Sequence, residues 1–179
     1  MSKTQIALLR GINVGKAKRI SMGDLRSLVE RLGYGNVRTL LNSGNVIFES
    51  PKDGPQVSGA KIEKAIVARL GISSNVIVLT AAELNSIIAG NPLLKVATNP
   101  SLFLVAVLAD PRDRITIQPL ASQDWSPGAL GIGKRVAYLW CPDGSLKSPL
   151  ADALNRLLAD RVTARNWATM LKLQTIANG

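Results

Sequence analysis

Histidine is absent from this 179-residue chain, and cysteine occurs once, as Cys141. Without an imidazole, serine–histidine and cysteine–histidine nucleophile pairs and histidine metal sites are excluded. A single cysteine excludes an internal disulfide, a thiolate zinc site and an iron–sulfur cluster. We therefore expect no metal, no cofactor and no catalytic residue of these kinds, and we interpret Cys141 as a structural thiol in a reducing cytoplasm.

Aromatic residues and long apolar runs are also scarce. Phe, Trp and Tyr make up 4% of a chain that is 46% hydrophobic, so the core must be built from aliphatic side chains. No apolar run approaches the roughly 18 residues that a membrane span needs. The first residues, Met1–Gln5, lack the apolar region of a signal peptide. These features predict a cytoplasmic globular protein without a membrane partner.

Acidic residues are outnumbered. The chain carries 22 Lys and Arg against 12 Asp and Glu, for a net charge of +10. The excess is spread over both halves, but within the first 26 residues only Asp24 opposes six basic side chains. A polyanionic partner such as nucleic acid is one interpretation. Solubility through net charge explains the excess equally well.

The order of predicted elements suggests a duplicated fold. Strand, helix, two strands, helix and strand follow one another in residues 1–90, which is the ferredoxin-like alternation, and residues 91–179 repeat it. Segment 111–124 stays open, because Ile115-Thr116-Ile117 favours a strand where the repeat requires a helix. We expect an α/β (α+β type) protein of two tandem ferredoxin-like βαββαβ-type units, an internal duplication, in one compact globule.

Local signals give the helix starts and an alignment of the halves. Ser21, Ser148 and the capping box of Thr80 with Glu83 are predicted N-caps. Thr163 is predicted to cap the last helix, with Arg165 and Asn166 in its first turn.

An offset of 90 residues pairs Val46 with Val136 and Phe48 with Tyr138. For Tyr138 and Trp167, core packing is preferred over base or ligand stacking.

Three polar clusters stand out as candidate ligand sites. The first lies between a strand and a helix start, where backbone N–H groups and lysines favour an anion. It is no Walker A loop, because its glycine spacing is one residue short and Ala17 replaces the Ser or Thr. The residues of the three clusters are Arg10, Gly11, Asn13, Gly15, Lys16, Lys18 and Arg19; Asn42, Ser43 and Asn45; and Thr163, Arg165 and Asn166.

Each cluster has a competing explanation. The first could be a glycine-rich connection with solvated lysines. Asn42 to Asn45 could serve only a tight hairpin, since Asn and Gly supply positive φ angles. Arg165, placed against the dipole of a helix start, favours a functional or inter-half role.

The chain resembles a bacterial family, the domain-of-unknown-function 1697 family, over almost its whole length. The motifs that carry the resemblance are Ala7–Gly15, Ser21–Met22 with Leu25–Arg26, Val37–Thr39, Ser43–Phe48, Val136–Gly144 and Thr163–Thr169. Two departures are Leu40, where the family more usually has Tyr, and the β-branched stretch 114–119. The resemblance implies a compact protein of repeated ferredoxin-like units. It implies no accepted activity, so no catalytic residue is carried over.

The leading hypothesis is a cytoplasmic binding protein for a phosphate-bearing ligand, either nucleic acid or a phosphorylated small molecule, at a site shared by both halves. One alternative is an enzyme that acts on a small anionic substrate without histidine or metal. Another is that the polar motifs serve only the interface between the halves. The sequence does not predict an oligomeric state.

Overall fold

The computed structural model describes residues 3–179 and divides into two compact units. The first unit comprises the chain up to Leu84 together with Leu173–Gly179, and the second comprises Asn85–Lys172. The division falls inside two helices, α3 (Ala81–Ala89) and α6 (Trp167–Asn178). The last seven residues therefore belong with the first unit, whereas the sequence assigned them to the second half.

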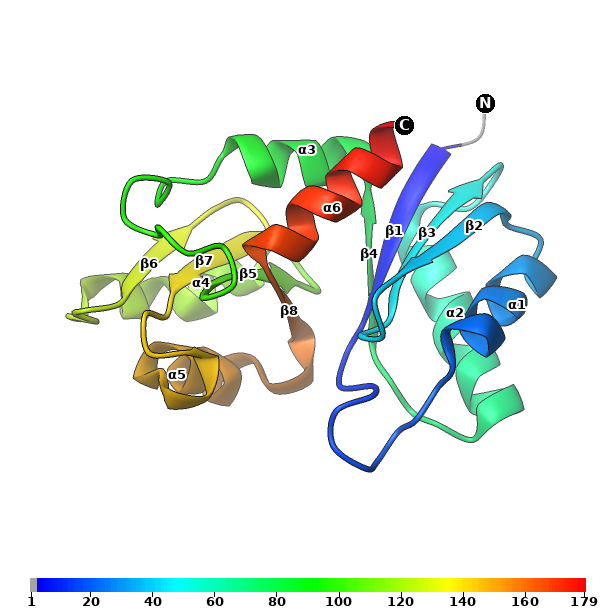
Figure 1. Ribbon diagram of the computed structural model, residues 1–179, viewed down its shortest axis with the longest axis horizontal. Coiled ribbons are helices and arrows are strands. Elements are labelled where there is room, and N and C mark those ends of the chain that lie inside the picture. Colours follow the sequence, from blue (N-terminus) through cyan, green and yellow to red (C-terminus); the bar gives the residue numbers. More distant parts are fainter. Residues whose placement is uncertain (1–2) are drawn as a thin grey trace. The chain divides into compact units, whose positions relative to one another are not determined.

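The first unit is a four-stranded antiparallel sheet in the order β2-β3-β1-β4 (Figure 1). Its elements are β1 (Lys3–Leu9), α1 (Met22–Arg31), β2 (Gly35–Leu40), β3 (Asn45–Ser50), α2 (Pro55–Leu70) and β4 (Val76–Thr80). Both the element order and the strand order are ferredoxin-like, as the sequence predicted.

The second unit repeats this topology, with the strand order β6-β7-β5-β8. Its elements are β5 (Phe103–Leu108), α4 (Asp113–Ile117), β6 (Ala129–Ile132), β7 (Val136–Trp140), α5 (Pro149–Leu158) and β8 (Val162–Asn166), with short 3-10 helices at Gln118–Ser122, Ser145–Lys147 and Ala159–Arg161. The fold of two tandem ferredoxin-like units is thereby confirmed.

The open segment 111–124 is helical from Asp113 to Ser122, as its place in the repeat requires. Ile117 and Leu120 are buried in the core of the second unit, whereas Ile115 is 74% exposed. The β-branched residues favour a strand locally, but burial of one helical face overrides this weak preference.

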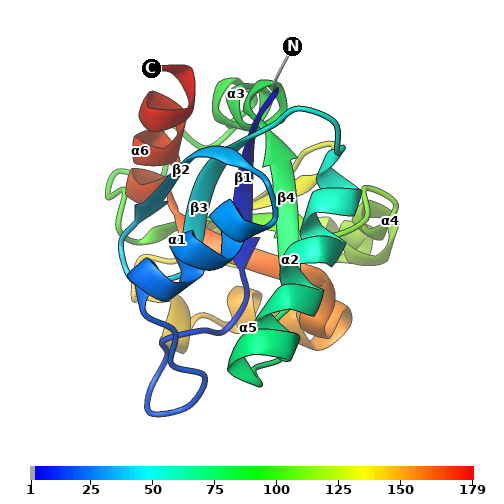
Figure 2. The ribbon, with the colours of Figure 1, turned by 90° about the vertical axis from the view of Figure 1, so that its right-hand side faces the viewer.

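One face of the first sheet packs against α1 and α2 (Figures 1 and 2). Alternate strand residues point to this face, because side chains alternate along a strand. The core there joins Ala7, Leu9, Val46 and Phe48 of the strands to Leu25, Val29, Ile62 and Ile66 of the helices. Phe48 also contacts the Tyr34 ring, with centroids 4.7 Å apart.

In the second unit, aromatic residues fill the sheet face that points away from the core of α4 and α5. The ring centroid of Phe103 lies 6.3 Å from that of Tyr138 and 5.3 Å from that of Trp167. Tyr138 is 2% exposed, and its hydroxyl donates to the Ile87 carbonyl at 2.7 Å. The preference for core packing over stacking at Tyr138 and Trp167 is confirmed.

The alignment of the halves by an offset of 90 is wrong by one residue. Phe48 lies opposite Gln5, and Leu139 lies opposite Leu104 at the corresponding place in the second sheet. Phe48 and Leu139 both face the helices, whereas Tyr138 points to the opposite face. A slip of one residue along a strand reverses every side chain, so the sequence match paired opposite faces.

Three of the four predicted N-caps are confirmed, because the hydroxyls of Ser21, Thr80 and Ser148 accept the expected backbone N–H bonds. The prediction for Thr163 is wrong. Residues 162–166 form strand β8, and α6 begins only at Trp167. Asn166 caps this helix, since its Oδ1 accepts the Thr169 N–H at 2.9 Å.

Candidate functional site: a basic loop at the end of the first sheet

Residues 10–20, the basic loop, connect β1 to α1 and extend beyond the end of the first sheet (Figures 1 and 2). Lys16, Lys18 and Arg19 are all exposed. Their nearest acidic neighbour in the sequence is Asp24, which is exposed in the first turn of α1. The loop is thus a local concentration of positive charge.

The backbone of the basic loop takes left-handed conformations repeatedly. Gly11, Asn13, Gly15 and Lys18 have φ angles of 65°, 54°, 62° and 50°. Glycine adopts this region without strain, and asparagine tolerates it better than most residues. The Gly and Asn of the sequence motif therefore shape the loop in addition to any ligand contact.

Asn13 closes the basic loop with its side chain. Its amide nitrogen donates to the carbonyls of Ile20 and Asn42, at 2.8 and 2.7 Å, and its Oδ1 accepts the Ile20 N–H at 2.9 Å. Both N–H donors of the amide are therefore committed to backbone. Asn13 positions the loop against the turn between β2 and β3.

That turn, residues 41–44, packs tightly beneath the loop. The Gly44 carbonyl accepts the Leu9 N–H at 2.9 Å, and Gly44 has a φ of 77°. A Cβ at this position would lie 2.6 Å from Ile12 Cδ1 and 2.7 Å from Leu9 Cβ. The sequence predicted a tight hairpin at this point, and the structure adds that only glycine leaves room for the loop.

A polar hollow of about 380 Å³ opens where the loop, the turn and the start of α1 meet. Its lining is Asn13, Arg19, Ile20, Ser21 and Asn42. Three of these residues are among those that the sequence singled out for ligand binding. The Arg19 guanidinium, the Asn42 side-chain amide and the N-terminus of the ten-residue helix α1 can all donate to an anion.

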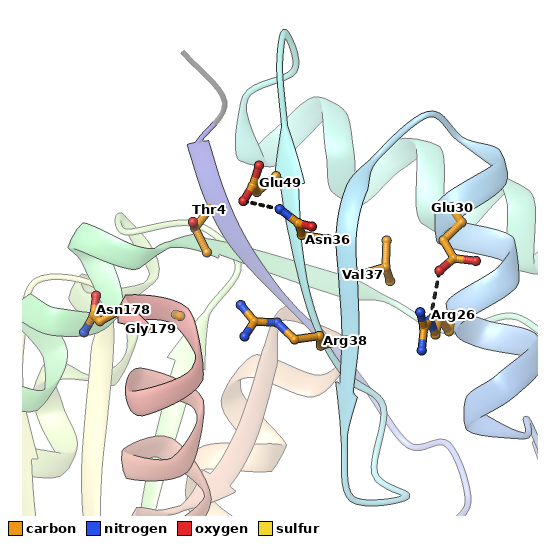
Figure 3. Close-up of a pocket in the computed structure, with 10 residues that line it drawn as sticks. Thr4, Arg26, Glu30, Asn36, Val37, Arg38, Glu49, Asn178 and Gly179 are labelled. Carbon is orange, nitrogen blue, oxygen red and sulfur yellow. Dashed lines mark hydrogen bonds and ion pairs between the residues drawn. The ribbon is translucent and has the colours of Figure 1, made fainter.

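A larger hollow of about 700 Å³ lies along the outer strand β2 of the same unit (Figure 3). Its charged groups are mixed. Arg26 pairs with Glu30 at 2.8 Å, Glu49 accepts from Asn36 at 2.6 Å, and Arg38 donates to the Ile176 carbonyl at 3.0 Å. Because acids and bases are present in equal number among these side chains, this hollow gives an anion no net attraction.

The residues that the sequence predicted to bind a ligand differ in their exposure and in the hydrogen bonds that they already make. Lys16, Lys18, Arg19, Asn42 and Ser43 are exposed. Asn45 is fully buried and donates to the Leu40 carbonyl at 2.9 Å. Arg10 is half-buried at the end of β1, where its backbone N–H bonds Asn75 and its carbonyl accepts from Ser74.

The other three predicted residues lie on β8 in the second unit. Thr163 is 1% exposed, and Asn166 is occupied as the α6 cap. Arg165 donates to the Ala164 carbonyl at 2.9 Å, and burial lowers its pKa to about 10, so it stays charged at neutral pH. A site shared by both halves stays a prediction.

A hollow of about 360 Å³ in the second unit has mixed walls that include Trp125, Cys141 and Lys147. Burial raises the pKa of the Cys141 thiol. A protonated, buried thiol is a poor nucleophile, which agrees with a structural role for this residue.

Metal-binding clusters and membrane-spanning helices are both absent from residues 3–179. Over that range, no three Cys, Asp or Glu side chains lie close enough together to hold a metal ion. No helix of the same part of the chain is long and apolar enough to cross a lipid bilayer.

Sequence reasoning missed two exposed apolar residues, one in the basic loop and one in the turn beneath it. Val14 is 72% exposed and Leu41 is 51% exposed. The exposure of Val14 had a signal, since it stands in a Gly- and Lys-rich stretch. Leu41 had none, because it continues a strand-like run and leaves it only through its left-handed φ of 57°.

The fold and this site define a class: a tandem ferredoxin-like α/β protein with a cationic loop at the end of its first sheet. The chain belongs to the family described as a protein of unknown function, DUF1697, whose model matches residues 2–138. Among solved structures, it is similar to the conserved bacterial protein SP0830 from Streptococcus pneumoniae, with 20% identity, a TM-score of 0.81 and 99% of both chains covered. That likeness shows the shared fold. No functionally curated protein matches the chain.

Proposed function

We propose that this protein is a cytoplasmic anion-binding protein that holds the phosphates of nucleic acid on its basic loop. The observation that carries the proposal is the exposure of Lys16, Lys18 and Arg19 on one short loop whose base is a polar hollow. Lysine attracts phosphate as a compact charge, and arginine binds it through a planar fork of donors.

The closure of the loop supports this proposal. Asn13 joins the loop to Ile20 at one end and to the turn at Asn42, through bonds of 2.7 to 2.9 Å. A loop that is already ordered loses less conformational entropy when it binds than a mobile one. The three cations are thus presented on a fixed frame.

The composition of the whole chain also supports the proposal. The net charge of +10 gives a long-range attraction for any polyanion, and this attraction falls as salt rises. A small phosphorylated molecule in the 380 Å³ hollow is the alternative form of the same chemistry, since it would use Arg19 and Asn42 alone.

The test is a binding titration by fluorescence anisotropy against nucleic acid, a nucleotide mixture and inorganic phosphate at several salt concentrations. We expect nucleic acid to bind, with the logarithm of the binding constant falling linearly as the logarithm of the salt concentration rises. The variant K16Q/K18Q/R19Q should reduce the magnitude of that slope by about 2 to 3, because each lost duplex phosphate contact contributes about 0.9.

The matched control is K52Q/K64Q/R69Q, which removes the same charge from exposed positions of the first unit outside the loop. It should weaken binding much less than the loop variant. Equal losses in the two variants would show that only net charge matters. Salt-independent binding of the nucleotides alone would assign the hollow to a small ligand and overturn the nucleic-acid proposal.

A further inference from the structure

None of the seven aromatic residues of this protein is fully exposed on its surface. Three Trp, two Tyr and two Phe are present, and six of them are at most 9% exposed. The seventh, Trp125, is half-buried, and its indole N–H donates to the Leu120 carbonyl at 2.7 Å. Proteins that bind single strands rely on exposed aromatic rings, on which unpaired bases stack. This surface offers no such platform.

The exposed apolar side chains near the cations of the basic loop are aliphatic instead of aromatic. Val14 lies in the basic loop, and Leu41 lies in the turn that supports it. The bond from the Asn13 amide to the Asn42 carbonyl, 2.7 Å long, holds the backbones of the two segments next to each other. Both side chains remain largely in solvent, at 72% and 51% exposure. Exposed aliphatic side chains flanked by Lys, Arg and Asn are the combination that minor-groove binders present to DNA.

From this juxtaposition we propose that the nucleic acid is double-stranded DNA, entered from its minor groove. Lys16, Lys18 and Arg19 contact phosphates, while Val14 and Leu41 contact the apolar sugar and base edges of the groove. The inference rests on the proposed function and names its ligand class.

Duplex RNA fits the site less well. Its recognition depends on polar contacts to 2′-hydroxyls across two successive minor grooves, over a span of about 16 base pairs. The site on this protein is one short loop with one exposed aliphatic side chain, Val14, in the loop and another, Leu41, in the turn beneath it. It can contact one groove, and its two aliphatic side chains cannot form hydrogen bonds with the 2′-hydroxyls of an RNA groove.

The experiment compares one DNA duplex, each of its two single strands and the RNA duplex of the same sequence, by fluorescence anisotropy at fixed salt. We expect the DNA duplex to bind at least about tenfold more tightly than either single strand. The variant V14S/L41S should weaken duplex binding by about threefold to tenfold while leaving the salt slope unchanged, because it removes apolar contact and no charge.

The control for the apolar pair is V57S/V67S, which changes two valines of α2 that are 49% and 52% exposed. It should leave duplex affinity unchanged. Circular dichroism and thermal melting of both variants confirm that they fold.

The outcomes separate the two proposals. Absence of salt-dependent binding to any nucleic acid overturns the proposed function itself. Binding that is lost in K16Q/K18Q/R19Q, but is as tight for single strands or duplex RNA as for duplex DNA, keeps the proposed function and overturns this inference. The inference is also overturned if V14S/L41S binds the duplex as the unchanged protein does.

Discussion

Among single residues, Asn13 holds the basic loop in place. Its three side-chain bonds join positions that are seven and 29 residues away in the sequence. Its backbone is left-handed, with a φ of 54°. One residue therefore sets both the local turn and the contact between loop and hairpin.

The variant N13G should free the loop without straining its backbone. Glycine accepts the positive φ, but it loses all three side-chain bonds. We expect trypsin to cleave after Lys16, Lys18 or Arg19 about tenfold faster than in the unchanged protein, because the free energy needed to open the loop locally is lower. The measurement is the initial cleavage rate by mass spectrometry. An unchanged rate would show that other contacts hold the loop.

A second prediction concerns Gly44 and the stability of the folded protein. In G44A the new Cβ would meet Ile12 and Leu9 at 2.6 and 2.7 Å, on a backbone with a φ of 77°. We expect a loss of about 2 kcal/mol or more in the free energy of unfolding, measured with urea. The control G35A, at an open position without a positive φ, should cost much less. Equal costs in the two variants would contradict the packing argument.

The two tyrosines give a prediction on pH. Burial raises the pKa of Tyr138 to about 12, and burial also raises the pKa of Tyr34. A raised tyrosine pKa means that the folded state keeps a proton that the unfolded chain loses near pH 10. The resulting stability is present below pH 10 and is lost as the pH rises toward 12.

Tyrosinate absorbance should therefore show both groups ionising above pH 10. In Y138F the higher step should disappear. That variant should also lose about 1 kcal/mol of stability, because the Ile87 carbonyl loses its donor. A titration step near pH 10 that Y138F removes would contradict the burial of Tyr138.

At the scale of elements, each ferredoxin-like unit passes directly from its last strand into a helix. Thr80 ends β4 and caps α3, and Asn166 ends β8 and caps α6. The two caps are at equivalent places in the two units, but their residue types differ. The sequence prediction placed the second cap three residues too early, at Thr163 instead of Asn166.

The variant N166A should destabilise α6 by about 1 kcal/mol, the usual cost of removing an N-cap. N166D should retain most of that stability, since a carboxylate accepts the Thr169 N–H equally well and favours a helix N-terminus. Thermal unfolding of both variants provides the measurement. A larger loss in N166D than in N166A would contradict the capping role.

At the scale of the whole molecule, the net charge of +10 acts on the folded state through self-repulsion. Raising the salt concentration from about 10 mM to about 150 mM shortens the screening length from about 30 Å to about 8 Å. We expect the melting temperature to rise over this range. The rise should be smaller in K16Q/K18Q/R19Q, where three neighbouring charges are gone. A melting temperature that falls with added chloride would contradict this expectation.

The strands and most of the helices could be predicted because their signals are local. Ser21, Ser148 and the Thr80–Glu83 pair mark helix starts by chemistry that acts over three residues. The helix at 113–117 could not be settled, since its β-branched residues favour a strand and only burial of Ile117 against the second core decides the matter. The one-residue slip that paired Phe48 with Tyr138 has the same origin, because both are aromatic and only the strand register tells the two faces apart.

By itself, the sequence determined the two ferredoxin-like units, the hairpin at 42–45, the cationic character of residues 10–19 and the exclusion of histidine chemistry. These follow from residue identity and from patterns a few residues long. Tertiary structure alone decided which of the polar residues are exposed and which are occupied by hydrogen bonds within the fold. Asn13 and Asn45 are committed to backbone carbonyls and Asn166 to a helix cap, while Lys16, Lys18 and Arg19 stay in solvent. The physical reason is that a hydrogen bond already made within the fold leaves that donor or acceptor unavailable. These partners, three to 29 residues away, are fixed only once the chain has folded.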